Sequence, residues 1–430
     1  MPRLLYISPY FPPQTRVGAL RPLKFVRHLG DFGWDVTVLC DLKRGAAVDP
    51  DLLQHVPENV EVVADYARGA AERFAALQGA PPPPPKSPAA PRPPGRLKRF
   101  ARTLETRLWS PEYVPLGEHS LDIPWARSAA TRLLERGGYD AILVNADPYA
   151  AMLVGDTMGE RFGVPVVHDL RDPWATCDLR RPRRPAPQRA LIDRLERRCV
   201  AGSHAFVLNT ATALDVARAH YADDPALVDR LRFVRNHGDP ALVDHGAWDT
   251  PNRFTLLFLG TFRRFVQGEA LLRALALLAE RGRTPRDLAL RITGTISPEA
   301  QDTIRALGVT DFVETHPFVP YPEVGPFMRT ADLLIAVTHA STMRIPAKFY
   351  DYATSDRPLL MIGDPRHTEL AGLVADLPGA TWADLTDPLA IADAIESAMG
   401  AGRQQHVERS AAGLDSRTAT ARLVELLPRV

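Results

Sequence analysis

The sequence is poor in cysteine, and its three cysteines, Cys40, Cys177 and Cys199, show no C-x-x-C spacing. This scarcity argues against a disulfide framework and a cysteine zinc site, and it predicts a reducing compartment. No apolar run approaches the roughly 18 residues that a membrane-spanning helix needs. The run 4–8 is too short for the apolar part of a signal peptide. We therefore expect a cytoplasmic protein without a membrane-spanning segment.

An excess of charge of one sign is also missing, because 52 lysine and arginine residues stand against 51 aspartate and glutamate residues. Without a global positive field, no nucleic-acid partner is expected. No cluster with metal-ligand spacing is visible, so neither a metal nor a resident cofactor is predicted. What is present is an ordinary globular composition, 45% hydrophobic and 24% charged, over 430 residues. This length is enough for two domains that each bury a core.

The stretch 338–364 brings several signals together. The apolar run 333–337 predicts a buried strand before it, and a short helix is expected from about residue 347. Lys348 and Asp351 stand at i and i+3 of that helix, so both side chains should lie near one face. A strand, a loop and a helix N-terminus in this order are typical of phosphate binding in α/β proteins. Lys348 can neutralise a phosphate, and Asp351 can accept hydrogen bonds from sugar hydroxyls. The alternative interpretation is a surface Lys–Asp pair on an ordinary helix.

Residues 345–361 also resemble the segment P-S-K-x-x-E-Y-x-A-x-G-x-P of GT-B glycosyltransferases of family 4. The resemblance implies that Lys348 and Asp351 bind a nucleotide-sugar donor, with Asp351 on the ribose. Many family members carry a second glutamate eight residues before the ribose acid, where this chain has Met343. They also carry a glycine where this chain has Asp356.

The amino-terminal region predicts a further mononucleotide-binding pattern. A loop at 9–16 joins a strand at 4–8 to a helix at 19–29, and it resembles the amino terminus of GT-B proteins. The resemblance implies that Gly18 approaches the donor phosphates, with Arg16 and Arg21 on the acceptor side. The alternative is an ordinary turn in which the glycine only permits the backbone conformation.

The strand predicted at 164–170 runs into the sequence H-D-L-R-D-P-W, a second resemblance to family 4. It implies that His168 lies near the donor sugar and that Asp169 or Asp172 is the base or the orienting acid. A base must reach the acceptor hydroxyl within hydrogen-bond distance. The structural alternative is that Asp172 caps the following turn and that the arginine between the two acids pairs with a carboxylate. Asp147, in the loop after a strand at 141–145, is a further acceptor-side candidate.

The second half restarts the strand–loop–helix pattern after a linker at 236–252. Arg263 and Arg264 follow a strand at 254–259, where the resemblance implies diphosphate contacts, but Gln267 replaces the family lysine. Cationic compensation of this kind needs no metal. Phe318 and Val319 stand where the resemblance places contacts with the base; core packing is the alternative for both.

Two stretches are rich in proline and arginine. Nine prolines between residues 81 and 94 predict an extended or disordered insertion at 80–95. The basic segment 92–109 with interleaved apolar residues suggests peripheral contact with an anionic membrane at the inner face, or with a lipid-linked acceptor. The alternative is a solvated helix. Residues 180–185 are predicted to form an exposed loop.

Together these patterns predict an α/β protein with two Rossmann-like domains facing a central cleft, the GT-B fold. Residues 1–235 form the acceptor-side domain, 253–410 the nucleotide-sugar domain, and 411–430 a terminal helix that packs back on the first domain. The resemblance implies transfer of a sugar from a nucleoside diphosphate to a glycan, lipid-linked or small-molecule hydroxyl, with retention. The alternatives are a nucleotide-sugar epimerase and a degenerate GT-B scaffold that only binds a partner. The residues that depart from the family pattern, such as Met343 and Gln267, support the scaffold hypothesis.

Overall fold

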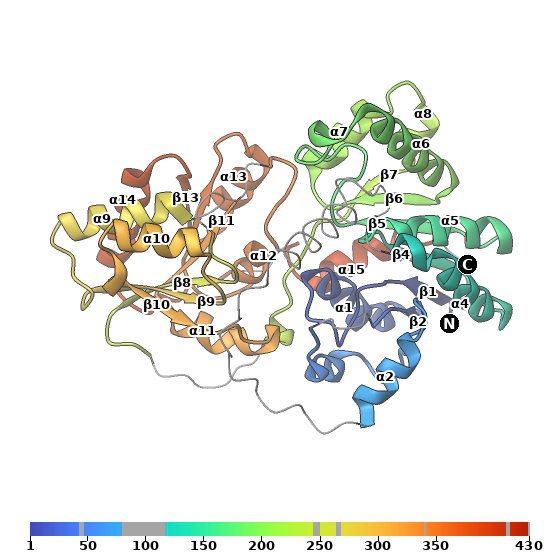
Figure 1. Cartoon of the computed structure of the whole chain (residues 1–430), viewed down its shortest axis with the longest axis horizontal. Helices are drawn as coiled ribbons and strands as arrows, with labels where there is room; N and C mark the ends of the chain where they lie inside the picture. The colour runs from blue at the N-terminus through green and yellow to red at the C-terminus, as the bar shows by residue number, and fades with distance from the viewer. Residues whose placement is uncertain are drawn as a thin grey trace, which may run out of the picture. The chain divides into compact units, whose positions relative to one another are not determined.

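This computed structural model describes residues 1–42, 47–79, 117, 119–243, 250–263, 268–338, 341–409 and 413–428. The chain folds into two compact units, one formed by Met1–Val234 with Thr420–Val430 and the other by Arg235–Ala419. Each unit holds one parallel sheet with helices packed on it (Figure 1). Several predicted features lie outside the described residues: the proline-rich insertion 80–95, the basic segment 92–109, Arg264 and Gln267.

The first unit is built on a seven-stranded sheet in the order β3-β2-β1-β4-β5-β6-β7. Its strands are β1 (Arg3–Ile7), β2 (Asp35–Leu39), β3 (Glu61–Val63), β4 (Ala141–Asn145), β5 (Val166–Leu170), β6 (Ala205–Leu208) and β7 (Leu231–Phe233). Its helices are α1 (Val17–Leu29), α2 (Ala70–Gly79), α4 (Ile123–Glu135), α5 (Ala150–Phe162), α6 (Ala186–Gly202), α7 (Ala211–His220) and α8 (Pro225–Val228), together with the later part of α15 (Ser416–Val424). The strand order reverses between β1 and β4, so ligands are expected at the carboxyl ends of these two strands.

Helix α1 begins two residues earlier than its apolar spacing predicts, which places Pro22 in its interior. A proline has no N–H to donate to the carbonyl four residues before it, here that of Gly18. Asn145 Nδ2 donates to this carbonyl instead, at 3.4 Å, and to Ser8 Oγ at 3.1 Å. The start of α1 is therefore tied to the carboxyl ends of β1 and β4.

The second unit is built on a six-stranded sheet in the order β10-β9-β8-β11-β12-β13, which reverses between β8 and β11. Its strands are β8 (Phe254–Leu259), β9 (Leu288–Thr293), β10 (Val313–His316), β11 (Leu333–Val337), β12 (Leu359–Gly363) and β13 (Ala380–Asp384). Its helices are α9 (Glu269–Glu280), α10 (Pro298–Ala306), α11 (Gly325–Thr330), α12 (Ala347–Ala353), α13 (Thr368–Ala375) and α14 (Pro388–Ala401). Separate apolar clusters fill the two faces of this sheet.

The predicted class, an α/β fold with two Rossmann-like domains, is confirmed. The strands were predictable because both faces of a parallel sheet are buried, which makes each strand a short continuous apolar run. Among the described residues, no helix is long and apolar enough to cross a membrane.

Candidate functional site

In the second unit, the carboxyl end of β8 is completed by helix α12 and not by a strand. The pairing of β8 with β11 ends at Leu257, so the N–H and C=O of Leu259, which point to the same side, have no strand partner there. The Leu259 N–H donates to Tyr352 Oη at 3.1 Å, and Lys348 Nζ donates to the Leu259 carbonyl at 2.6 Å. Two side chains of α12 thus fill the point where the strand order reverses.

Lys348 is held at this point by weak neutral partners. Its Nζ lies 3.7 Å from the centre of the Phe258 ring, a cation–π contact. Desolvation by burial lowers the pKa of Lys348 from 10.5 to about 7. No carboxylate pairs with it among the described residues. An anion that entered this site would therefore meet a donor already in place, and it would favour the protonated form.

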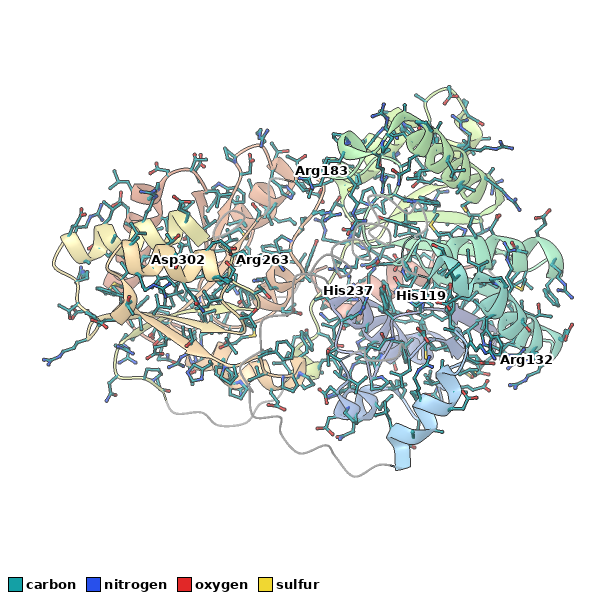
Figure 2. The ribbon with its side chains drawn as sticks, viewed as in Figure 1. His119, Arg132, Arg183, His237, Arg263 and Asp302 are labelled. Atoms are coloured by element: carbon teal, nitrogen blue, oxygen red, sulfur yellow. The ribbon has the colours of Figure 1, made fainter. Side chains whose placement is uncertain are left out.

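The backbone next to Lys348 leaves room that only glycine allows. Gly260 has a φ of +102°, and a Cβ atom there would lie 3.8 Å from Lys348 Nζ. Gly294, after β9, has a φ of +144°, and a Cβ there would lie 2.3 Å from the Gly260 carbonyl oxygen. Side chains are thus excluded from these two adjoining loops. Arg263 follows in the same loop with an exposed side chain and is labelled in Figure 2; its neighbour Arg264 lies outside the described residues.

Asp351 has different surroundings from Lys348, although both belong to α12. Tyr321 Oη donates to Asp351 Oδ1 at 2.6 Å. Burial, and then the charge of Asp351, raise the pKa of Tyr321. Asp351 also lines a cavity of about 250 Å3 with Asp239, Met328 and Arg329. The i and i+3 spacing was therefore a poor guide to a shared contact, because the two side chains reach different elements.

The remaining donor-side candidates differ in exposure. Phe318 is 62% exposed, whereas Val319 is partly buried against the core cluster that contains α12. The Phe318 ring is thus open to contact with a ligand. Val319 packs against the core, which was the alternative to base contact. Met343, in the place of the family glutamate, is buried.

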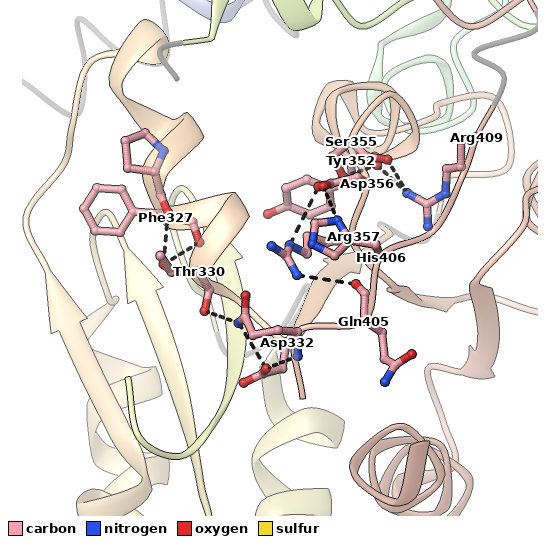
Figure 3. A network of polar contacts seen from close by, with 12 residues as sticks. Phe327, Thr330, Asp332, Tyr352, Ser355, Asp356, Arg357, Gln405, His406 and Arg409 are labelled. Atoms are coloured by element: carbon pink, nitrogen blue, oxygen red, sulfur yellow. Dashed lines mark hydrogen bonds and ion pairs between the residues drawn. The ribbon is translucent and has the colours of Figure 1, made fainter. Parts of the chain in front are cut away.

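Asp356, in the place of the family glycine, belongs to a polar network that fastens residues 404–409 to the end of α12 (Figure 3). Asp356 Oδ2 accepts from His406 Nδ1 at 2.8 Å, and Arg409 Nη1 donates to the carbonyls of Tyr352 and Ser355 at 2.8 and 3.1 Å. Arg357 Nη1 donates to the Gln405 carbonyl at 3.4 Å. This departure from the family pattern therefore has a structural explanation within the chain.

In the first unit, Gly18 lies against a pair of opposite charges at the carboxyl ends of β4 and β5. A Cβ on Gly18 would lie 3.2 Å from Arg171 Nη1 and 3.4 Å from Asp147 Oδ2. Arg171 Nη1 donates to Asp147 Oδ2 at 3.1 Å. Desolvation raises the pKa of Asp147, and the Arg171 charge opposes this rise. These residues therefore lie together at the carboxyl edge of the sheet.

Arg21 and Asp169, by contrast, form a buried ion pair. Arg21 donates from Nε and Nη2 to the two carboxylate oxygens at 2.8 and 2.7 Å, and Nη2 also donates to the Val234 carbonyl at 3.0 Å. The side chains are 2% and 0% exposed. A base needs access to the acceptor hydroxyl, so this contact favours a structural role for Asp169 and for Arg21. Arg16 is exposed, and its Nη1 donates to Tyr10 Oη at 3.0 Å.

His168 faces the opposite side of β5. Its side chain is fully buried, and its Cε1 lies 3.6 Å from the position of a Cβ on Gly155 of α5. Neither ring nitrogen has a hydrogen-bond partner among the described residues, and burial lowers the pKa of His168 to about 3. The ring is neutral and packs edge-on against Phe206. These surroundings are those of a core residue.

Asp172 lies in a charged and aromatic group that the sequence only partly indicated. Arg180 Nη2 approaches Asp172 Oδ2 at 3.8 Å, and Arg180 Nη1 donates to Tyr149 Oη at 2.8 Å. The Tyr149 ring stacks on Trp174 with a centroid distance of 5.1 Å. The sequence signals for this group were Pro173 and Trp174 after Asp172 and the arginine-rich stretch 180–185. The prediction of an exposed loop at 180–185 was wrong for its last arginine, Arg184, which is 2% exposed.

The described residues contain no group of three or more histidine, cysteine, aspartate or glutamate side chains arranged to hold a metal ion. What the structure brings together is a cation with glycine loops in the second unit, and paired charges beside a helix start in the first. Each arrangement stands at the carboxyl ends of strands where the strand order reverses, the usual ligand position in open α/β sheets.

Two parallel sheets with this organisation match the GT-B fold. The chain matches a structure titled an alpha,alpha-trehalose-phosphate synthase from Burkholderia vietnamiensis, with a TM-score of 0.61 and 13% identity, over 99% of this chain and 98% of that one. It also matches a UDP-GlcNAc 2-epimerase from Neisseria meningitidis, with a TM-score of 0.53 and 12% identity, over 99% of both chains. Likeness at this identity shows the fold alone.

No family model matches the chain. In sequence it is similar to a D-inositol 3-phosphate glycosyltransferase from Pseudarthrobacter chlorophenolicus, at 29% identity over 224 residues, 49% of this chain and 52% of that relative. The similarity to a protein of the same name from an Arthrobacter species is 25% over 289 residues. The chain spans about half the length of the first of these relatives. The predicted resemblance to GT-B glycosyltransferases of family 4 is confirmed.

Proposed function

We propose that the protein is a glycosyltransferase that moves a sugar from a nucleoside diphosphate sugar to a hydroxyl acceptor. The observation that carries this proposal is Lys348, which stands at the carboxyl end of β8 with a backbone carbonyl as its hydrogen-bond acceptor. A diphosphate leaving group needs positive charge or aligned N–H groups to stabilise it. The similarity to proteins named glycosyltransferases supports the same conclusion.

In this proposal the second unit binds the donor. Lys348 and the exposed Arg263 compensate the diphosphate, and the glycine loops let the phosphates approach the backbone. Asp351 accepts from the ribose hydroxyls, while Tyr321 holds its carboxylate. Phe318 is exposed and available to stack on the base. The proposal includes transfer with retention of the anomeric configuration. It also includes transfer without a metal ion, because the side chains themselves supply the positive charge.

The first unit binds the acceptor in this proposal. Of the candidate acids, Asp147 and Asp172 have accessible carboxylates, with side-chain exposures of 36% and 22%. Either one can accept a hydrogen bond from an acceptor hydroxyl, and Asp172, in the segment that resembles family 4, is the candidate for the base. Cytoplasmic localisation and peripheral membrane contact through 92–109 stay predictions.

The test is a thermal-shift titration with UDP, GDP, dTDP and ADP, followed by turnover assays with sugars of the nucleotide that binds. A ligand at tens of times its Kd should raise the Tm by a few degrees. Lys348→Met keeps the length of the side chain and removes its charge. We expect it to weaken binding of the preferred nucleotide about ten- to a hundredfold, because a charge-assisted hydrogen bond contributes about 1.5–3 kcal/mol.

The matched control is Arg286→Met, which removes an exposed positive charge before β9, at the amino ends of the strands. It should bind the nucleotide like the wild type. If no nucleotide shifts the Tm, or if Lys348→Met binds as tightly as the control, the proposal is wrong and the degenerate-scaffold hypothesis gains. Release of the nucleoside diphosphate without any acceptor would instead favour an epimerase.

A further inference from the structure

The loop after β5 ends in an arginine that is almost completely enclosed. Arg184 is 2% exposed, and its Nη1 donates to the Trp174 carbonyl at 2.6 Å. Its Nε and Nη2 atoms are buried and have no hydrogen-bond partner among the described residues. A guanidinium carries five N–H donors in a fixed plane, so most of its hydrogen-bonding capacity is unused.

The carboxyl group of Glu196 favours the charged form of Arg184, but neither of its oxygens accepts from Arg184. Burial lowers the pKa of Arg184, but a guanidinium stays protonated at neutral pH. The neighbouring acid, Glu196, accepts from the Ala175 N–H at 2.9 Å and from Tyr221 Oη at 2.7 Å. Both carboxylate oxygens of Glu196 are therefore occupied by donors other than Arg184. A buried N–H donor without an acceptor is unfavourable, so the Nε and Nη2 atoms of Arg184 call for a ligand with acceptor oxygens.

A second guanidinium adds to the positive charge. Arg180 lies close enough to Arg184 to oppose its protonation. Arg180 is only partly buried, with its side chain 24% exposed, and its nearest carboxylate, on Asp172, is 3.8 Å away. Arg181, between them, is already neutralised by Asp193 through two hydrogen bonds of 2.6 and 3.0 Å. Arg180 therefore adds a partly exposed positive charge on the same loop as Arg184.

We propose that Arg184 and Arg180 form a binding site for a phosphate-type oxyanion. Arg184 supplies the enclosed Nε and Nη2 donors, and Arg180 supplies the partly exposed side from which the anion enters. Paired N–H groups of a guanidinium match the spacing of two oxygens on a phosphate. The anion is either free in solution or a group on a larger molecule, and the site is distinct from the proposed diphosphate site at Lys348.

The site has a consequence for the residues beside it. Arg184 is bonded to the carbonyl of Trp174, and Trp174 stacks on Tyr149, whose hydroxyl accepts from Arg180. An anion that bridged the two arginines would join Arg180, which lies beside Asp172, to Arg184, which donates to the Trp174 carbonyl. Its occupancy would therefore link both arginines to the segment that follows β5.

The experiment measures the Tm of the full chain against inorganic phosphate at constant ionic strength, maintained with choline gluconate. We expect a rise of about 3 °C at roughly ten times the Kd. Arg184→Met should abolish this rise. It should also be at least as stable as the wild type without phosphate, because it removes buried N–H groups that have no acceptor.

Three further variants make the result specific. Arg183→Met removes the exposed arginine next to Arg184 (labelled in Figure 2) and should keep the full rise. Lys348→Met should keep it too, because that residue belongs to the other anion site. Arg180→Met, at a partly exposed position, should fold normally and lose most of the rise, which serves as the test if Arg184→Met does not fold.

Two results would overturn the proposal. One is a phosphate effect equal to that of gluconate, which would mean that internal water satisfies the buried donors. The other is a rise that survives Arg180→Met or a folded Arg184→Met. A parallel titration with glycerol 3-phosphate separates the two sources: a response to both ligands indicates a site for free phosphate, and a much stronger response to the ester indicates a phosphate carried by a polyol.

Discussion

The two units reverse their strand order in the same way but fill the reversal point differently. In the first unit, the Asn145 amide bridges to Ser8 and to the carbonyl of Gly18. In the second unit, the Lys348 ammonium and the Tyr352 hydroxyl take the two polar groups of Leu259. One reversal point is thus closed by a neutral side chain, and the other holds a cation.

The charges around these two points follow the same division. In the first unit, arginines and aspartates meet in pairs, including the enclosed pair of Arg21 and Asp169. In the second unit, the positive charge of Lys348 rests on a carbonyl and an aromatic ring. The comparison teaches that a positive charge at this edge of the fold can be paired with a carboxylate of the chain or held by neutral groups.

The largest expected effect comes from breaking the enclosed pair of the first unit. Arg21→Met should lower the free energy of unfolding by about 3–5 kcal/mol, because it leaves the Asp169 carboxylate buried without its partner. Denaturant titration of the purified variant measures this loss.

The control is the double variant Arg21→Met, Asp169→Leu. It should regain most of the lost stability, since an apolar pair of similar volume often replaces a buried ion pair at little cost. If the double variant is as unstable as the single one, the contact with the Val234 carbonyl matters more than the ion pair. If it stays stable but the first unit then loses a bound acceptor, Asp169 has a role in binding.

The second prediction concerns pH and the cation of the second unit. The pKa of Lys348 is lowered to about 7, so the amine loses its proton above this pH in the empty site. Diphosphate binding needs the proton, whereas the phosphate itself is fully ionised above about pH 7. The Kd of the preferred nucleotide should therefore rise by up to about tenfold per pH unit above 7. Calorimetric titrations at pH 6.5, 7.5 and 8.5 measure this slope.

Lys348→Met is the control and should bind weakly with no such slope. The lowered pKa of Lys348 also makes the folding stability depend on pH. The unfolded chain keeps the lysine proton up to about pH 10, so between about pH 7 and pH 10 it binds more protons than the folded chain. The contribution of Lys348 to stability therefore increases with pH across this window. A flat Kd in the wild type would mean that the ammonium is charged without a ligand.

The smallest effect is expected at His168. His168→Leu should change turnover by less than about threefold and leave stability equal or slightly higher, because it removes two ring nitrogens without partners. Steady-state kinetics of the active enzyme, together with a denaturation curve, test both parts. A loss of more than a hundredfold in turnover with intact nucleotide binding would restore the hypothesis that His168 contacts the sugar.

Strands such as β4, β8 and β11 were predictable to the residue, because buried parallel strands are written as short apolar runs. Helix α5 was not predictable in this way. It carries Gly155 and Gly159, which are poor helix formers. They are required by packing, since a Cβ at these positions would lie 2.4 Å from a Val144 methyl and 2.3 Å from a Val166 methyl. Local propensity carries no trace of such a close approach.

For the candidate site, the sequence indicated which residues reach the carboxyl edges of the sheets but not which partners they contact. Lys348, Asp147 and Gly18 stand at carboxyl ends of strands, as the pattern requires. Arg21 and Asp169 are 148 residues apart, and nothing local indicates that they pair. The period of two along β5 separates His168 from Asp169, but the period does not tell which face is buried against a helix. Tyr321 and Arg184 were missed because nothing local in the sequence indicates their contacts either.

The contact between α12 and Leu259 provides a built-in reporter. The amide proton of Leu259 is protected by a side-chain hydroxyl of Tyr352 and not by a neighbouring strand, so it exchanges with deuterium only when α12 moves away. A nucleotide that draws Lys348 toward its phosphates would remove one of the two ties between that helix and the strand. Mass-spectrometric exchange of the peptide that covers β8 would then register donor binding without a label, an assay for turnover or a known acceptor.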